Sequence, residues 1–218
     1  MSAAAEPTVY PDARPVLITW AGVLALVVLL GIGWHVGLAG YVGVLRQDSP
    51  WTYLKAAERY SEQKNWVGAM DMLQEAAKRG PESPVPYERM GIILYQQRGD
   101  WPGAIEQFRK ALERGSDSLD VRGKTIWALI HLKQYEDAVT FGQQCIDEGS
   151  GSPYFPRFVG EALFRAGEFK RAVPYLEKAL DAFPADMLLM ERLLASYKEL
   201  GAEAKAARLE KRMHEHEG

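Results

Sequence analysis

The chain has 218 residues, of which 47% are apolar and 25% are charged, a composition typical of a globular protein. The formal net charge is only -3, and acids and bases are spread along the chain. This excludes a typical nucleic-acid-binding protein, because such proteins carry a basic face. Cys145 is the single cysteine, so neither an internal disulfide nor a multi-thiol metal site can form. We expect this thiol to pack as a small buried hydrophobe.

The first feature in chain order is a long apolar segment. No Asp, Glu, Lys or Arg occurs between Val16 and Leu45, and about 20 apolar residues suffice to cross a bilayer. The segment therefore predicts a transmembrane helix over 15–45, after an N-terminal tail of residues 1–14. A cleaved signal peptide is the alternative, but its apolar region would span only about 7 to 15 residues behind a basic start.

Glycines crowd the second half of this segment. Gly33 and Gly37 have the GxxxG spacing that lets another helix approach closely, and we include Gly40 in this candidate contact face. A glycine-rich exit from the membrane is the alternative interpretation. His35 is the one imidazole in the segment, which raises the hypothesis of an axial ligand to a cofactor. A histidine at the level of the lipid headgroups, beside Trp34, is the simpler interpretation.

After a short linker over 46–49, the pattern changes to apolar residues at helical spacing, broken about every 15 residues by Gly, Pro or polar clusters. Small residues recur at intervals of 35, 34, 34 and 34 positions, at Ala69, Ala104, Ala138, Ala172 and Ala206. Large aromatic side chains stand three positions before the first four, at Trp66, Trp101, Tyr135 and Phe169. This register predicts pairs of helices whose neighbours bury one another's apolar faces.

These motifs resemble the tetratricopeptide repeat family. The resemblance is carried by "MGIILYQQRGDWPGAIEQFRKAL" (90–112) and "VGEALFRAGEFKRAVPYLEKALDAFP" (159–184), in which Met90-Gly91 and Val159-Gly160 stand at the family's Leu-Gly pair. It implies an all-α fold, with the single N-terminal transmembrane helix followed by an α-solenoid of about five helix-turn-helix repeats. We place this repeat domain at 50–218, with repeats at about 50–83, 84–118, 119–152, 153–186 and 187–218.

Three repeats depart from the family's pattern. The second holds one extra residue near "YQQRG", which predicts a looser turn between its helices. The third lacks the Leu-Gly pair and has Gly142 where a large residue is usual, which predicts weaker packing. The fifth ends in "AEAKAARLEKRMHEHEG", whose charges are expected of a cap that faces solvent.

In this family the first helices of the repeats line a concave groove. The resemblance therefore implies a partner-binding face that mixes aromatics with arginines, the residue types that anchor protein interfaces. Carried over by position, this face comprises Tyr95, Gln96, Trp127, Ile130, His131, Tyr154, Arg157, Glu161, Phe164 and Arg165. Packing between repeats is the alternative role for Trp127 and Phe164. The asparagines of the family's carboxylate clamp are missing at the matching positions, so a clamp of that kind is not expected.

No phosphate loop, nucleotide fingerprint, nucleophile elbow or zinc helix motif occurs in the sequence. We therefore expect a non-enzyme with no cofactor, no metal and no small-molecule substrate. The expected function is a single-pass scaffold in a bacterial inner (cytoplasmic) membrane that binds protein partners as a fixed subunit or assembly factor of a membrane complex. The side of the membrane that the repeats occupy stays open.

Two alternatives remain for the function. One is a chaperone-like accessory at a secretion or translocation machinery. The other is a cofactor-contacting subunit of an energy-converting membrane complex, which would act through His35.

Overall fold

The computed structural model describes residues 49–149 and 151–217, and the regular elements in these ranges are all helical. The predicted transmembrane helix, its glycine face and His35 fall in residues 1–48, outside the described residues. They therefore stay predictions from the sequence. In the part of the chain that the structure describes, no helix is both long enough and apolar enough to span a bilayer.

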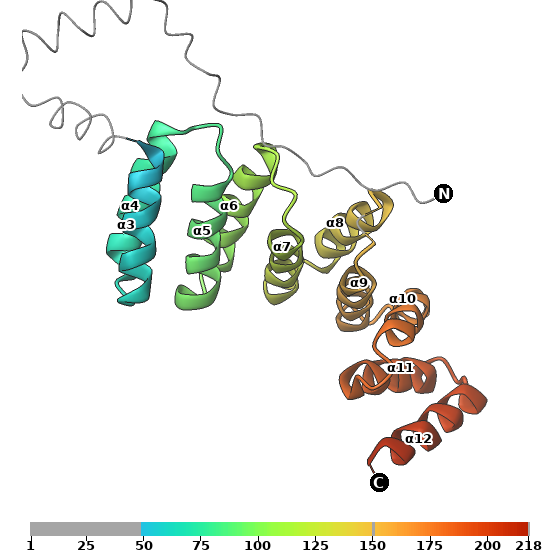
Figure 1. Ribbon diagram of the computed structural model, residues 1–218. Helices are drawn as coiled ribbons and strands as arrows, with labels where there is room; N and C mark the ends of the chain where they lie inside the picture. The colour runs from blue at the N-terminus through green and yellow to red at the C-terminus, as the bar shows by residue number, and fades with distance from the viewer. Residues whose placement is uncertain (1–48, 150, 218) are drawn as a thin grey trace, which may run out of the picture. The chain divides into compact units, whose positions relative to one another are not determined.

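The described residues form five successive pairs of α-helices (Figure 1). The first helices of the pairs are α3 (Pro50–Glu62), α5 (Val85–Ile93), α7 (Leu119–His131), α9 (Tyr154–Arg165) and α11 (Met187–Glu199). The second helices are α4 (Trp66–Arg79), α6 (Trp101–Glu113), α8 (Tyr135–Asp147), α10 (Phe169–Ala182) and α12 (Glu203–Glu217). Each helix packs against the next one along the chain. The expected all-α array of helix pairs is confirmed.

The small residues of the register lie where two helices meet. The alanines at this position are all buried: Ala69, Ala104, Ala138, Ala172 and Ala206. In the second repeat the close approach is completed by Gly91 of α5, because a Cβ atom at this position would lie 2.4 Å from Cε1 of Phe108 on α6. The ring of Phe108 thus occupies the place of a side chain at Gly91. Cys145 also lies in the core, and burial raises the pKa of its thiol, which agrees with the predicted packing role.

The turn inside each pair contains one residue in the left-handed region, with φ between 57° and 77°. The residues at this turn position are Lys64, Gly99, Lys133, Gly167 and Gly201. They are spaced by 35, 34, 34 and 34 positions, the same intervals as the buried alanines. Glycine adopts this conformation without steric cost, whereas the Cβ of a lysine is crowded in it.

This turn position gives a matched pair of stability predictions. We expect Gly167→Ala to lower the free energy of unfolding by about 1 kcal/mol, because nothing lies within 4 Å of its Cβ position and only the backbone conformation is penalised. Lys133→Gly should raise the free energy of unfolding by up to about 1 kcal/mol for the same reason. Urea unfolding followed by circular dichroism measures both changes. If both substitutions changed the free energy of unfolding in the same direction, this explanation would be contradicted.

The extra residue of the second repeat lies in a π-helical turn, η2 (Leu94–Arg98), which continues α5. The turn closes with a hydrogen bond of 3.1 Å from the Asp100 N–H to the Leu94 carbonyl. A wider helical turn takes up one residue without shifting the helix after it, so Gly99 keeps its place in the register of turns. The expectation of a looser turn was therefore wrong: the extra residue is taken up in the first helix, by the π-helical turn that contains Tyr95.

The expectation of weaker packing at Gly142 was also wrong. A Cβ atom at this position would lie 2.6 Å from Cγ2 of Val159 and 3.6 Å from Cδ1 of Ile126. The side chain of Val159, on α9 of the next repeat, therefore fills the space that a large residue on α8 would occupy. The missing volume is supplied by a neighbouring repeat.

The last three helices are joined by Tyr197, Glu177 and Lys205. The Tyr197 hydroxyl on α11 donates a hydrogen bond of 2.6 Å to Oε1 of Glu177 on α10, and Nζ of Lys205 on α12 lies 2.9 Å from the same oxygen. Burial and the hydrogen bond to Glu177 raise the pKa of Tyr197. The hydrogen bonds from the Tyr197 hydroxyl and from Lys205 lower the pKa of Glu177.

We expect Tyr197→Phe to lower the free energy of unfolding by about 1 kcal/mol at neutral pH. The folded pKa of Tyr197 lies above its unfolded value of about 10, so its contribution is present below about pH 10 and is lost as the pH rises through the folded value. The difference between wild type and Tyr197→Phe should therefore narrow above about pH 10. Urea unfolding at a series of pH values checks this, and a difference that grows with alkaline pH would contradict it.

Candidate functional site

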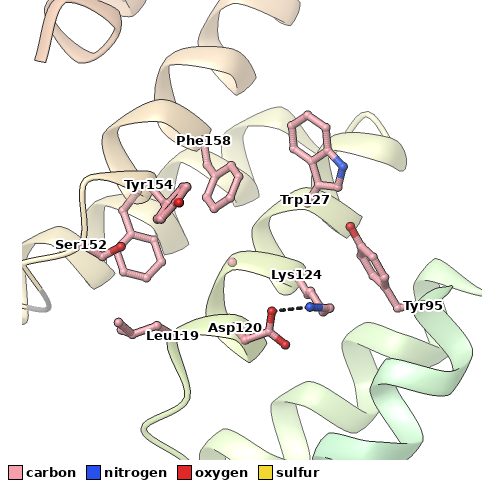
Figure 2. A pocket seen from close by; sticks show the side chains of 10 residues that line it. Tyr95, Leu119, Asp120, Lys124, Trp127, Ser152, Tyr154 and Phe158 are labelled. Carbon is pink, nitrogen blue, oxygen red and sulfur yellow. Dashed lines mark hydrogen bonds and ion pairs between the residues drawn. The ribbon is translucent and has the colours of Figure 1, made fainter. Parts of the chain in front are cut away.

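A pocket of about 470 Å³ lies between α7 and α9 and is bordered by the π-helical turn η2. Figure 2 shows aromatic side chains around its walls, with Tyr154 and Phe158 on one side and Trp127 and Tyr95 on the other. The complete lining consists of Tyr95, Leu119, Asp120, Gly123, Lys124, Trp127, Ser152, Tyr154, Phe155 and Phe158. Most of these residues come from the first helices of the third and fourth repeats.

The wall on α7 is one face of a helix. Asp120, Gly123 and Trp127 follow one another at steps of three and four residues, which places them on the same side. The Ser118 hydroxyl caps this helix by accepting a hydrogen bond of 3.3 Å from the Val121 N–H. Gly123 lets α9 come close, because a Cβ atom there would lie 3.1 Å from Cε2 of Phe158.

Two large apolar side chains at the pocket are exposed. The exposed fraction is 48% for Leu119 and 51% for Tyr154. The Tyr154 ring lies 6.5 Å from the ring of Phe158 and 5.0 Å from that of Phe183. Exposed apolar surface around a hollow marks an interaction site more often than scattered surface residues do.

The polar part of the pocket is an ion pair on α7. Nζ of Lys124 pairs with the carboxylate of Asp120, one turn earlier in the helix (Figure 2). The same ammonium lies 6.0 Å from the ring centre of Tyr95. Burial, together with the negative charge of Asp120, raises the pKa of Tyr95, so its hydroxyl stays protonated at neutral pH.

Aromatic contacts connect this pocket to the second repeat. The Tyr95 ring meets the Trp101 ring edge-on at 4.9 Å, and Trp101 stacks on His131 at 4.5 Å with 8° between the planes. The rings of His131 and Trp127 in turn form an edge-to-face pair, with their centres 5.6 Å apart. These rings hold Trp127 and Tyr95 in fixed positions beside the pocket.

A second group of charges lies on α9 and α11. Glu161 has a side chain that is only 7% exposed, and it accepts hydrogen bonds from Nε of Arg165 at 2.6 Å and from Nε of Arg192 at 3.2 Å. The Arg165 guanidinium lies over the Trp127 ring at 5.5 Å, and that of Arg192 lies over the Phe164 ring at 4.9 Å. The arginines are therefore linked to the pocket through Trp127.

The residues expected on the groove take several positions. Tyr95, Trp127 and Tyr154 line the pocket, while His131 stacks beside it and Arg165 lies next to it. Gln96 is exposed at the end of the first helix of its repeat.

Other expected groove residues pack inside the repeats. Ile130 is only 1% exposed and lies in the core, so its assignment to the groove is corrected. Phe164 is half-buried against Phe169 at 5.7 Å. Arg157, expected on the groove, is half-buried and forms an ion pair of 2.8 Å with Asp186.

Sequence reasoning missed several residues of the site. Leu119, Asp120 and Lys124 come from α7, Phe158 from α9 and Arg192 from α11. The helical spacing back from Trp127 could have identified Asp120. Arg192 carries no local signal, because its link to Glu161 joins residues 31 positions apart. Among the described residues, no group of three or more His, Cys, Asp and Glu side chains could hold a metal ion.

Comparisons with known proteins agree with this fold. The family model described as "Tetratricopeptide repeat" matches residues 90–153 and 160–215. A search of curated proteins finds no match.

Solved structures share the arrangement at low sequence identity. A structure of MamA from Desulfovibrio magneticus RS-1 has 20% identity and a TM-score of 0.68, over 78% of this chain and 96% of that one. A second MamA structure has 17% identity and a TM-score of 0.71, over 78% of this chain and 92% of that one. YrrB, whose structure is described as that of a repeat protein with an unusual peptide-binding site, has 15% identity and a TM-score of 0.68, over 83% of this chain and 92% of that one.

Proposed function

Because the chain belongs to the tetratricopeptide repeat family, we propose that it is a membrane-anchored scaffold that binds a protein partner. Its partner is another subunit of a membrane complex, which it joins as a fixed component or as an assembly factor. The repeats bind the partner through the pocket between α7 and α9, and the predicted helix over 15–45 keeps them at a bilayer. The protein carries out no chemistry of its own in this proposal.

One observation supports the binding role above the others. The pocket combines exposed apolar side chains, Leu119 and Tyr154, with the rings of Trp127 and Phe158, which are held by their neighbours. Rigid aromatic side chains in a concave site are the usual anchors of protein interfaces. The peptide-binding site for which YrrB is described is in keeping with such a role on this fold.

The membrane part of the proposal rests on the sequence. Thirty residues without a charged side chain, Val16 to Leu45, exceed the length of about 20 that a spanning helix needs. Only four residues, 46–49, join this segment to the first repeat, and they reach at most about 14 Å. Such a short tether favours a fixed partner in the same membrane over a distant one.

Membrane fractionation and affinity purification test the proposal. The full-length protein with a C-terminal tag is expected to stay in membranes washed with alkaline carbonate and, in mild detergent, to co-purify with one partner in constant proportion. The double variant Trp127→Ala, Tyr154→Ala should lose most of that partner while staying in the membrane. Val67→Ala, at an exposed position of α4, is the matched control.

Two results would contradict the proposal. Release of the protein by carbonate would contradict the membrane anchor. A protein that always purifies alone would contradict the scaffold role. A changing set of unfolded clients would instead favour the chaperone-like accessory.

A further inference from the structure

The charged network beside the pocket, formed by Arg165, Arg192 and Glu161, carries a net positive charge. Arg165 and Arg192 share the single carboxylate of Glu161, so this three-residue network of the described chain has one positive charge in excess. The acid is the buried member, with 7% of its side chain exposed, whereas the exposed fractions are 36% for Arg165 and 29% for Arg192. Solvent therefore meets the cations and not the carboxylate.

Both guanidinium groups are held in place before any partner arrives. Each donates its Nε–H to Glu161 and lies over an aromatic ring, Trp127 for Arg165 and Phe164 for Arg192. A guanidinium has five N–H donors in a planar fork, so four remain on each group for other acceptors. A second carboxylate matches this geometry, and ordering costs are low because the side chains are already fixed.

The spacing between the pocket wall and Arg165 follows α9. Phe158 lines the pocket, and Arg165 comes seven residues later on the same helix, which is two helical turns and about 10 Å. A peptide in the extended polyproline II conformation rises about 3.1 Å per residue and completes one turn every three residues, so side chains three residues apart point to the same side. Two side chains of a peptide bound in this conformation would therefore meet the pocket and the arginine pair if they were about three residues apart.

From this arrangement we propose that the partner segment carries an apolar side chain that enters the α7–α9 pocket and, about three residues away, an acidic side chain that binds Arg165 and Arg192. This inference rests on the proposed function and names the chemistry of the partner. The apolar side chain contacts Trp127, Tyr154 and Phe158. The acidic side chain neutralises the excess charge that Glu161 leaves.

Peptide selection on the full-length protein in lipid nanodiscs tests the inference. The probe is a random peptide library displayed on phage, counter-selected on the Trp127→Ala, Tyr154→Ala variant so that only pocket-dependent peptides remain. We expect the survivors to share an apolar residue with Asp or Glu about three positions away. The best of them should bind Arg165→Gln about tenfold more weakly, a change of about 1.4 kcal/mol, and Arg165→Lys should restore part of the binding.

The control variant is Lys170→Gln, which removes an exposed charge on α10 and should leave binding unchanged. Pocket-dependent peptides without an acidic residue, or with affinity unchanged in Arg165→Gln, would overturn the inference while leaving the scaffold function intact. If counter-selection on the Trp127→Ala, Tyr154→Ala variant left no binding peptide, the inference would also be overturned. The proposed function is contradicted by a different result, namely that the Trp127→Ala, Tyr154→Ala variant retains the native partner.

Discussion

Phe108→Ala is expected to lower the free energy of unfolding by about 3–5 kcal/mol. The Phe108 ring is fully buried in the second repeat, between α5 and α6, and it fills the place that Gly91 leaves open. Its removal takes away both the burial of the ring and the atoms that pack on the α5 backbone. The surrounding helices are held by their neighbours in the array, so they cannot collapse fully into the cavity.

Equilibrium unfolding in urea measures this loss as a shift of the midpoint at constant slope. Val67→Ala, which shortens an exposed side chain on α4, should change the free energy of unfolding by no more than about 0.5 kcal/mol. A loss below about 1 kcal/mol in Phe108→Ala would show that the contact between α5 and α6 is not the one described.

The second large effect is expected on the other side of the same contact. Gly91→Ala should lower the free energy of unfolding by about 1–3 kcal/mol, because the new methyl carbon would lie 2.4 and 2.5 Å from two ring atoms of Phe108. An aromatic ring that is buried on all sides cannot move away without shifting a helix. A helical alanine would otherwise be favoured over glycine by about 1 kcal/mol, so a loss would run against backbone propensity.

A double-mutant cycle separates this clash from other causes. In the Phe108→Leu background the ring is gone, and Gly91→Ala should lose most of its penalty, which appears as an interaction energy between the two sites of about 1 kcal/mol or more. Urea unfolding of the four proteins in the cycle gives this energy. Strict additivity would mean that Gly91 is required for another reason, such as its backbone conformation.

Much of the fold was predictable, because the repeat register is a local property of the sequence. The alanines at intervals of 34 and 35 residues lie in the core, as the spacing required. The exact place of the extra residue was not predictable, since a wider helical turn and a longer loop add the same length of chain. The packing at Gly142 was missed for a different reason: the side chain that fills the space, Val159, belongs to the next repeat.

The candidate site was predictable in part, since the sequence identified some of its residues but not the contacts between helices. Position within the repeat identified Tyr95, Trp127 and Tyr154, which line one pocket. It misplaced Ile130, whose side chain belongs to the buried core. The contact between Glu161 on α9 and Arg192 on α11 forms only when the helices stack, so no local sequence pattern predicts it.

Site-directed photo-crosslinking in native membranes tests most directly whether the pocket between α7 and α9 holds a partner protein at the membrane. A benzophenone amino acid is placed at Tyr154 and, as the reference, at the exposed Val67. We expect one dominant protein adduct from position 154, mapped to a single segment of the partner, and no such adduct from position 67. The absence of any adduct at position 154, or the same adducts at both positions, would contradict the proposed role of the pocket.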